Sequence, residues 1–256
     1  MTRDIFRSAK RVVVKVGSSS ISGENVSQID SLVEVLASAQ RGGREVVLVS
    51  SGAIATGMPL LNLEAKPDDL ATSQALASVG QSRLIARYQT QLEKYGILAG
   101  QVLLTADDLE GEETRSNAAR AMQRLIELRV LPIVNENDTT ATAEIRFGDN
   151  DRLAALVAIL VDADALILLS DVDSLYTAPP SDPTAERIAV VDFEDELEGV
   201  DIGGTSTSVG TGGAVTKVIA AKLANAQGIP VLLTSTQLVS QALEGDDVGT
   251  HFAAAK

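Results

Sequence analysis

The densest group of chemically useful side chains in this sequence lies between Asn135 and Arg152. The stretch reads NENDTTATAEIRFGDNDR, and it places seven acidic or amide residues in two clusters, Asn135–Asp138 and Asp149–Asp151, directly after the apolar run Leu131–Val134. Such a run is typical of a buried strand, and ligands of open α/β sheets bind beyond the carboxyl ends of strands. Asn and Asp also favour turns and helix caps, but a cap needs only one such residue. We therefore predict a ligand pocket, in which a hairpin over residues 141–147 folds the second cluster back onto the first.

Two lysines occupy positions that favour contact with an anion. Lys15 lies inside the β-branched run Arg11–Val16, where a buried ammonium costs free energy unless it is paired. We expect it to emerge at the strand end toward an anion, although a lysine reaching solvent from an edge strand is the alternative. Lys217 follows the Gly-, Ser- and Thr-rich run 203–216 and precedes an Ala-rich segment. This composition is typical of a phosphate loop at a helix N-terminus, and a disordered linker is the alternative.

Small polar residues also follow other predicted strands. Val46–Ser50 opens into Ser51-Gly52-Ala53, and Ala165–Leu169 ends in Ser170-Asp171. Lysines, glycine turns and carboxylates without a catalytic histidine or cysteine suit phosphoryl transfer, which needs positioning and charge neutralisation more than covalent chemistry. The P-loop, the GxGxxG turn and the protein kinase signatures are absent, so those classes are excluded.

The composition excludes several other classes. A net charge of -14 argues against nucleic acid as a partner, because phosphate backbones are bound by clusters of Lys and Arg. The sequence has no cysteine and one histidine, His251, which excludes disulfides, thiolate nucleophiles and multi-histidine metal sites. The N-terminus lacks the apolar core of a signal peptide, and no apolar run is long enough to span a membrane. We therefore expect a cytoplasmic protein with no membrane partner.

Strand and helix patterns alternate regularly, which predicts an α/β fold. The first helix is expected to begin with a capping box formed by Ser27 and Asp30. The run 177–201 is rich in Pro, Asp and Glu and is interpreted as an excursion or a small subdomain. The predicted strands are Arg11–Val16, Val46–Ser50, Ile97–Leu104, Leu131–Val134, Ala165–Leu169 and Pro230–Thr234, and the other helices are Thr72–Lys94, Thr114–Leu128, Leu153–Val161 and Val218–Gln227.

Five segments together resemble the amino acid kinase family, and they occur in the family's order between about Lys10 and Phe252. They are VKVGSS (14–19), SSGAI (50–54), NEND (135–138), FGDND (147–151) and GTGGAVTK (210–217). The paired NEND and GDND motifs are similar to those of the members that phosphorylate glutamate. The resemblance implies a three-layer α/β/α sandwich with a mainly parallel central sheet, formed by a single domain over residues 8–256.

The resemblance also implies an activity, which is the ATP-dependent phosphorylation of the γ-carboxylate of L-glutamate, the first step of proline biosynthesis. It implies Mg²⁺ on the ATP phosphates, with no metal ligand assigned directly, feedback inhibition by proline, and a homo-oligomer, either a dimer or a tetramer. A γ-carboxylate is ionised at neutral pH, so this reaction needs no general base.

The site residues implied by the resemblance fall into three groups. Lys15 and Lys217 would bridge the phosphoryl group in transfer, with Asp151 holding both lysines. Ser51, Asp138 and Asn150 would bind glutamate, Asp138 through its carboxylate to the ammonium group and Asn150 through amide N–H donors to the α-carboxylate. ATP would contact Lys15, Ser170, Asp171, Thr211, Gly212, Gly213, Ala214, Val215, Thr216 and Lys217.

Two alternatives stay open at this point. Another member of the family could phosphorylate a different acid or a nucleotide. A non-catalytic sensor on the same fold typically loses a catalytic lysine or carboxylate, whereas Lys15, Asp151 and Lys217 are all present.

Many bacterial members carry a C-terminal PUA domain, a fold otherwise known for binding RNA, and because this sequence ends at Lys256 we expect none here.

Overall fold

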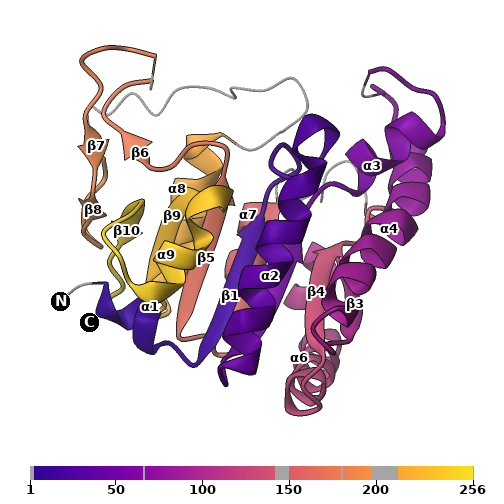
Figure 1. Cartoon of the computed structure of the whole chain (residues 1–256), viewed down its shortest axis with the longest axis horizontal. Helices are drawn as coiled ribbons and strands as arrows, with labels where there is room; N and C mark the ends of the chain where they lie inside the picture. Colours follow the sequence, from indigo (N-terminus) through magenta and orange to yellow (C-terminus); the bar gives the residue numbers. More distant parts are fainter. Residues whose placement is uncertain (1–2, 66, 142–149, 180, 198–212, 256) are drawn as a thin grey trace.

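A mainly parallel eight-stranded sheet forms the centre of the molecule (Figure 1). The computed structural model describes residues 3–65, 67–141, 150–179, 181–197 and 213–255. The strand order is β3-β4-β2-β1-β5-β9-β10-β8, and only the β9–β10 pair is antiparallel. The strands are β1 (Arg11–Val16), β2 (Glu45–Ser50), β3 (Ala99–Leu104), β4 (Leu131–Glu136), β5 (Ala165–Ser170), β8 (Val190–Val191), β9 (Val231–Ser235) and β10 (Thr250–Phe252).

Helices cover both faces of the sheet, which confirms the α/β/α architecture. Neighbouring residues of β1 point to opposite faces, so Val12 and Val14 belong to one apolar core and Val13 to the other. The helices on the first face are α1 (Asp4–Ser8), α2 (Gln28–Arg41), α4 (Leu70–Glu93) and α9 (Val239–Glu244), and those on the second are α6 (Glu112–Glu127), α7 (Asn150–Leu160) and α8 (Ala214–Asn225).

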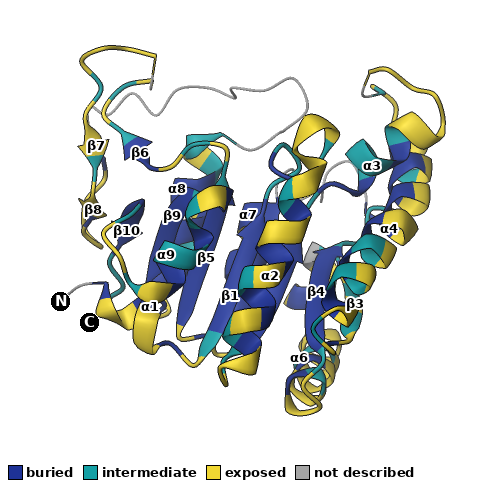
Figure 2. Ribbon diagram, in the orientation of Figure 1, coloured by how far each residue is buried: buried dark blue, intermediate teal, exposed yellow. Residues whose placement is uncertain are grey.

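The central strands are buried on both faces, as expected of parallel strands covered by helices (Figure 2). This explains why β1, β2 and β5 are almost continuously apolar in sequence. Lys15 is the exception within β1, and it falls on the same face as Val13 because side chains alternate along the strand. The side chain of Lys15 therefore lies on the face of the sheet that α7 and α8 cover.

Helix α3 (Ala53–Leu60) crosses α4 with almost no space between the two backbones. A Cβ atom built on Gly80 of α4 would lie 1.8 Å from the carbonyl oxygen of Ala53, and one built on Gly57 of α3 would lie 2.2 Å from that of Leu76. Only glycine at both positions allows this approach. The contact holds the beginning of α3, and with it the Ser51-Gly52 turn that follows β2, close to α4.

The predicted capping box of the first helix is wrong. A 3-10 turn, η1 (Gly23–Ser27), runs directly into α2, so Ser27 already has helical backbone angles and its side chain makes no capping hydrogen bond. Helix α5 (Ala106–Glu110) was not predicted from the sequence, and it does begin with a capping box. There the hydroxyl of Thr105 accepts from the backbone N–H of Asp108, and the carboxylate of Asp108 accepts from that of Thr105.

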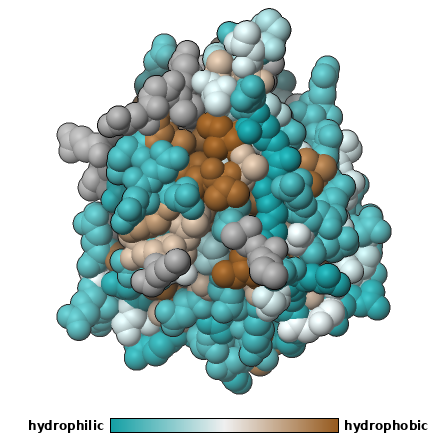
Figure 3. Space-filling model, turned by 90° about the vertical axis from the view of Figure 1, so that its left-hand side faces the viewer, coloured by the Kyte–Doolittle hydropathy of each residue, from teal (hydrophilic) through white to brown (hydrophobic). Residues whose placement is uncertain are grey.

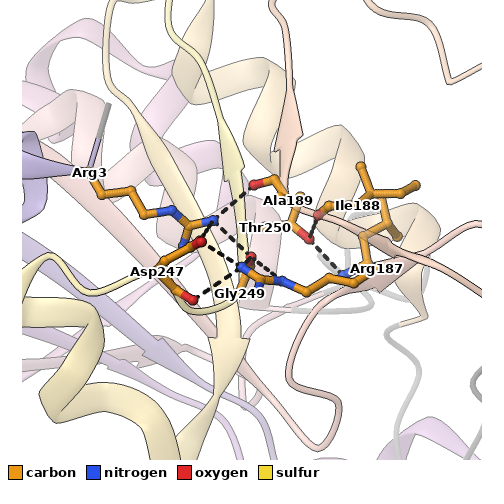
Figure 4. A network of polar contacts seen from close by, with 8 residues as sticks. Arg3, Arg187, Ile188, Ala189, Asp247, Gly249 and Thr250 are labelled. Carbon is orange, nitrogen blue, oxygen red and sulfur yellow. Dashed lines mark hydrogen bonds and ion pairs between the residues drawn. The ribbon is translucent and has the colours of Figure 1, made fainter. Parts of the chain in front are cut away.

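The predicted excursion after β5 is correct in part, because β8 within it belongs to the main sheet, and polar contacts tie the segment to both ends of the chain. It contains the small antiparallel pair β6 (Leu175–Tyr176) and β7 (Arg187–Ile188) before β8 joins the main sheet. Arg3 donates to the carbonyl oxygens of Ala189 at 3.0 Å and Gly249 at 3.1 Å, and Arg187 donates to Gly249 at 2.9 Å (Figure 4). Asp247 lies 3.0 Å from both guanidinium groups.

The side of the molecule that carries β8 and α8 exposes apolar side chains (Figure 3). Exposed apolar residues of these elements and of the segment after β8 are Val190, Phe193, Val215 and Ile219. Among the described residues, no helix is both long enough and apolar enough to span a membrane. The predicted hairpin over 141–147 lies outside the described residues except for Ala141.

Candidate active site

The candidate site lies at the carboxyl edge of the sheet, along the upper side of Figure 1. Strands β1, β2, β4 and β5 are parallel, so their carboxyl ends all lie at this edge. Helices α3, α7 and α8 begin near it, and their N-terminal N–H groups and dipoles favour negative charge. This edge can therefore bind an anionic ligand.

Two lysines from distant segments meet on one carboxylate. Lys15 of β1 forms an ion pair with Asp151 Oδ1, and Lys217 of α8 lies 3.0 Å from Asp151 Oδ2. The exposed fractions of Lys15, Asp151 and Lys217 are 1%, 0% and 7%. Asp151 belongs to the first turn of α7, where the helix dipole also stabilises a carboxylate. The structure thus brings together the three residues expected to be catalytic.

Burying this cluster is costly, because each ion loses its hydration when it leaves water. One carboxylate contacts both ammonium groups, and all three side chains are almost fully buried. An apolar cluster of the same volume would stabilise the fold at least as well. A buried ionic cluster of this kind at the carboxyl edge of the sheet is better explained by a role in ligand binding than by stability.

Thr216 supports the cluster from the start of α8. Its hydroxyl lies 3.2 Å from Asp151 Oδ2 and 2.9 Å from the carbonyl oxygen of Gly213. Thr216 was expected only as a nucleotide contact, and the structure places it beside the bridging carboxylate. Gly213, Ala214 and Val215 form the beginning of the same helix, whereas Thr211 and Gly212 lie outside the described residues.

A second group of polar side chains surrounds Asn150, the first residue of α7. Its amide nitrogen donates to Ser51 Oγ at 3.1 Å, to the carbonyl oxygen of Ser50 at 3.3 Å and to Asn135 Oδ1 at 2.6 Å. Two of the three residues expected to bind glutamate, Ser51 and Asn150, are therefore in direct contact. The third, Asp138, is half-buried in the turn that follows β4.

Helix α4 supports this polar group from behind. Gln81 accepts a hydrogen bond of 2.7 Å from the amide nitrogen of Asn135, and Tyr88 hydrogen-bonds to Ser50 Oγ at 2.9 Å. Burial raises the pKa of the Tyr88 phenol well above its usual value, so the hydroxyl stays protonated. Neither Gln81 nor Tyr88 was predicted from the sequence. The available signal was a pair of polar side chains on the buried stripe of α4, which also contains Leu84.

The expected nucleotide residues Ser170 and Asp171 lie at the carboxyl end of β5, beside β1. Ser170 is half-buried and donates to Asp171 Oδ1 at 3.1 Å, and Asp171 is exposed. No three His, Cys, Asp or Glu side chains gather as a metal site in the part of the chain that the structure describes. The carboxylates expected at this edge, such as Asp171 and Asp138, could each offer an oxygen atom to a metal ion.

The model of the amino acid kinase family matches residues 10–235. The chain belongs to the amino acid kinase family. Residues 236–256 lie beyond the match, so a single domain over residues 8–256 stays a prediction.

Similar proteins are named glutamate 5-kinase. The protein from Clavibacter sepedonicus is 68% identical over 246 residues, which cover 96% of this chain and 95% of that protein. The one from Leifsonia xyli subsp. xyli is 65% identical over 255 residues, or 99% and 94% of the two chains. The one from Streptomyces coelicolor is 54% identical over 98% of this chain and 69% of its own length.

Proposed function

We propose that this chain is a glutamate 5-kinase, which transfers the γ-phosphoryl group of ATP to the γ-carboxylate of L-glutamate in the first step of proline biosynthesis. The observation that carries the proposal is the contact of Lys15 and Lys217 with the two oxygens of Asp151 at the carboxyl edge of the sheet. Membership of a kinase family and the similarity to proteins named glutamate 5-kinase support the same reaction.

The chemistry of the site suits this reaction. The γ-carboxylate is already ionised at neutral pH, so it attacks without a general base. The barrier comes largely from repulsion between an anionic nucleophile and an anionic donor, and fixed positive groups lower it. Lys15 and Lys217 would neutralise the phosphoryl group as it passes between the two substrates, and Asp151 would keep both ammonium groups in place.

The nucleotide would lie over Ser170, Asp171 and residues 211–217, with its phosphates near the N-terminus of α8. A magnesium ion would arrive with the phosphates and supply further charge neutralisation. Carboxylates at this edge such as Asp171 could contribute an oxygen ligand, and ATP and water would supply the others. Glutamate would contact Ser51, Asp138 and Asn150 on the other side of the lysines.

Three finer properties belong to the same proposal. Proline would inhibit the enzyme by binding in the glutamate pocket, because it shares the α-carboxylate and the α-nitrogen of glutamate. The protein would act as a dimer or tetramer, and it would work in the cytoplasm. These properties follow from the resemblance to the family members that phosphorylate glutamate.

An assay of ADP release tests the proposed reaction. The purified chain is incubated with ATP and Mg²⁺, with glutamate or without it, and then with N-acetylglutamate, aspartate or UMP as the acceptor. We expect release that depends on glutamate and is far slower with the other three acceptors. Equal rates with another acceptor would reassign the substrate within the family, and absence of release with all four would indicate a non-catalytic binding protein.

A further inference from the structure

We propose that Gln81, acting through Asn135, is a positioning residue that holds the side-chain amide of Asn150 with its carbonyl oxygen toward the α-ammonium group of the acceptor. The proposal rests on the proposed function, since it concerns how the same pocket selects glutamate. It reverses the role expected from the sequence, in which Asn150 donates N–H groups to the α-carboxylate.

The orientation of Asn150 is set by backbone groups that cannot exchange donor for acceptor. The backbone N–H of Glu136 can only donate, and it donates to Asn135 Oδ1 at 2.9 Å. The carbonyl oxygen of Ser50 can only accept, and it accepts from Asn150 Nδ2. If the Asn150 amide were turned over, its oxygen would face the oxygens of both Ser50 and Asn135. The hydrogen-bond network therefore assigns the nitrogen of Asn150 to the protein interior.

The groups that Asn150 and Ser51 leave available for a ligand are of opposite kinds, one an acceptor and the other a donor. Both hydrogens of Asn150 Nδ2 are committed to protein acceptors, and within the part of the chain that the structure describes its oxygen accepts no hydrogen bond. Ser51 Oγ accepts from Asn150, so its own hydrogen can be donated. Asn150 thus offers an acceptor, suited to an ammonium group, and Ser51 offers a donor, suited to a carboxylate.

Gln81 completes the network from α4. It is 9% exposed, Asn135 is 3% exposed, and the 2.7 Å bond between them satisfies the amide nitrogen of Asn135. Without this acceptor a buried N–H group would lack a partner, which is unfavourable and favours rotation of Asn135 away from Asn150. Gln81 bonds to Asn135, which in turn accepts from Asn150, so its effect on acceptor binding would pass through these two residues.

The test compares glutamate with glutarate, which has hydrogen in place of the α-amino group. Gln81→Met keeps the length of the side chain and removes its amide. We expect the KM for glutamate to rise about tenfold, the effect of weakening one hydrogen bond to a charged group, while the KM for ATP stays within about twofold. The preference of the enzyme for glutamate over glutarate should fall by a similar factor, because glutarate has no α-ammonium group to contact Asn150.

Matched variants separate positioning from general damage. Gln81→Glu keeps an acceptor oxygen at the same place and should restore most of the affinity for glutamate. Gln89→Met changes the same residue type on the same helix, but Gln89 accepts from the backbone N–H of Ala99 at 2.8 Å. This control variant should change neither the KM for glutamate nor the preference for glutamate over glutarate. Equal rises in the KM of both substrates, or an unchanged glutamate preference in Gln81→Met, would overturn the proposal.

The wild-type protein provides an independent measurement that needs no variant. In 2-hydroxyglutarate a hydroxyl donor replaces the ammonium group, and in 2-oxoglutarate a carbonyl acceptor replaces it. An acceptor group on Asn150 predicts that 2-hydroxyglutarate is phosphorylated better than 2-oxoglutarate, and the reverse order would overturn the assigned polarity. Absence of ADP release with glutamate itself would instead reject the proposed function, so the two failures are distinguishable.

Discussion

The ring of Phe6 packs edge-on against the ring of His251, with centroids 5.3 Å apart and an interplanar angle of 87°. Both residues are buried, and neither ring nitrogen of His251 has a hydrogen-bond partner among the described residues. Burial and the nearby Arg3 hold the pKa of His251 below its usual value, against the opposing effect of Asp192. The folded protein therefore keeps this histidine neutral.

Stability should decrease when the pH falls through about 6.5, the usual pKa of histidine. Between the two pKa values His251 is protonated in the unfolded chain but not in the folded chain. The free energy of unfolding therefore drops as the pH falls toward the lowered pKa. His251→Phe removes the titrating group while keeping an aromatic ring. Urea unfolding of both proteins at pH 7.5 and pH 5 measures the effect, and an equal loss in both proteins would contradict it.

Lys217→Ala and Lys15→Ala should each lower kcat by about a hundredfold or more, because an electrostatic contact to the transferring group is typically worth that much. Lys222→Ala is the matched control, since Lys222 belongs to the same helix as Lys217 but pairs with the exposed Glu196 at 2.9 Å. Steady-state kinetics with saturating ATP and glutamate measure kcat. Near wild-type turnover in either active-site variant would contradict the assignment.

Asp151→Asn should lower kcat strongly and change the two KM values little. The amide keeps the shape of the carboxylate but loses the charge that holds Lys15 and Lys217, and an orienting group acts mainly in the transition state. The same kinetic assay separates the two parameters. A loss confined to the KM for glutamate or ATP would make Asp151 a substrate ligand.

Gly80→Ala should destabilise the fold by about 1–3 kcal/mol, the usual cost of overpacking, and should raise the KM for glutamate. The new methyl group would collide with the carbonyl oxygen of Ala53, so α3 must move and carry the Ser51-Gly52 turn with it. Ser82→Ala, at an exposed position of the same helix, is the control. Thermal melting and glutamate kinetics test both effects, and wild-type values for Gly80→Ala would show that the contact can relax.

Proline should inhibit competitively with glutamate if both occupy the pocket around Ser51, Asp138 and Asn150. Initial rates are measured at several concentrations of both compounds with ATP held constant. The apparent inhibition constant should rise linearly with the glutamate concentration. Inhibition that does not change with glutamate would place proline at a separate site.

The sequence predicted the architecture because apolar periodicity is a local property. The strand around Lys15 and a helix near Lys217 were both predicted from the order of the residues, although the helix was expected from Val218 and begins at Ala214. The capping box at Ser27 failed because a preceding turn already supplied helical geometry, a competition that spacing alone does not reveal. The bond from Gln81 to Asn135 joins residues 54 positions apart, and only packing determines such a contact.

The bridge at Asp151 also ties activity to the last stages of folding. Lys217 lies 66 positions from Asp151 in the chain, and Lys15 belongs to the first strand. Contacts between distant segments form late, because the entropy of closing long loops must be overcome first. Refolded protein should therefore regain helical circular dichroism before it regains catalysis, and the interval between the two signals would report how long the three charged segments take to assemble.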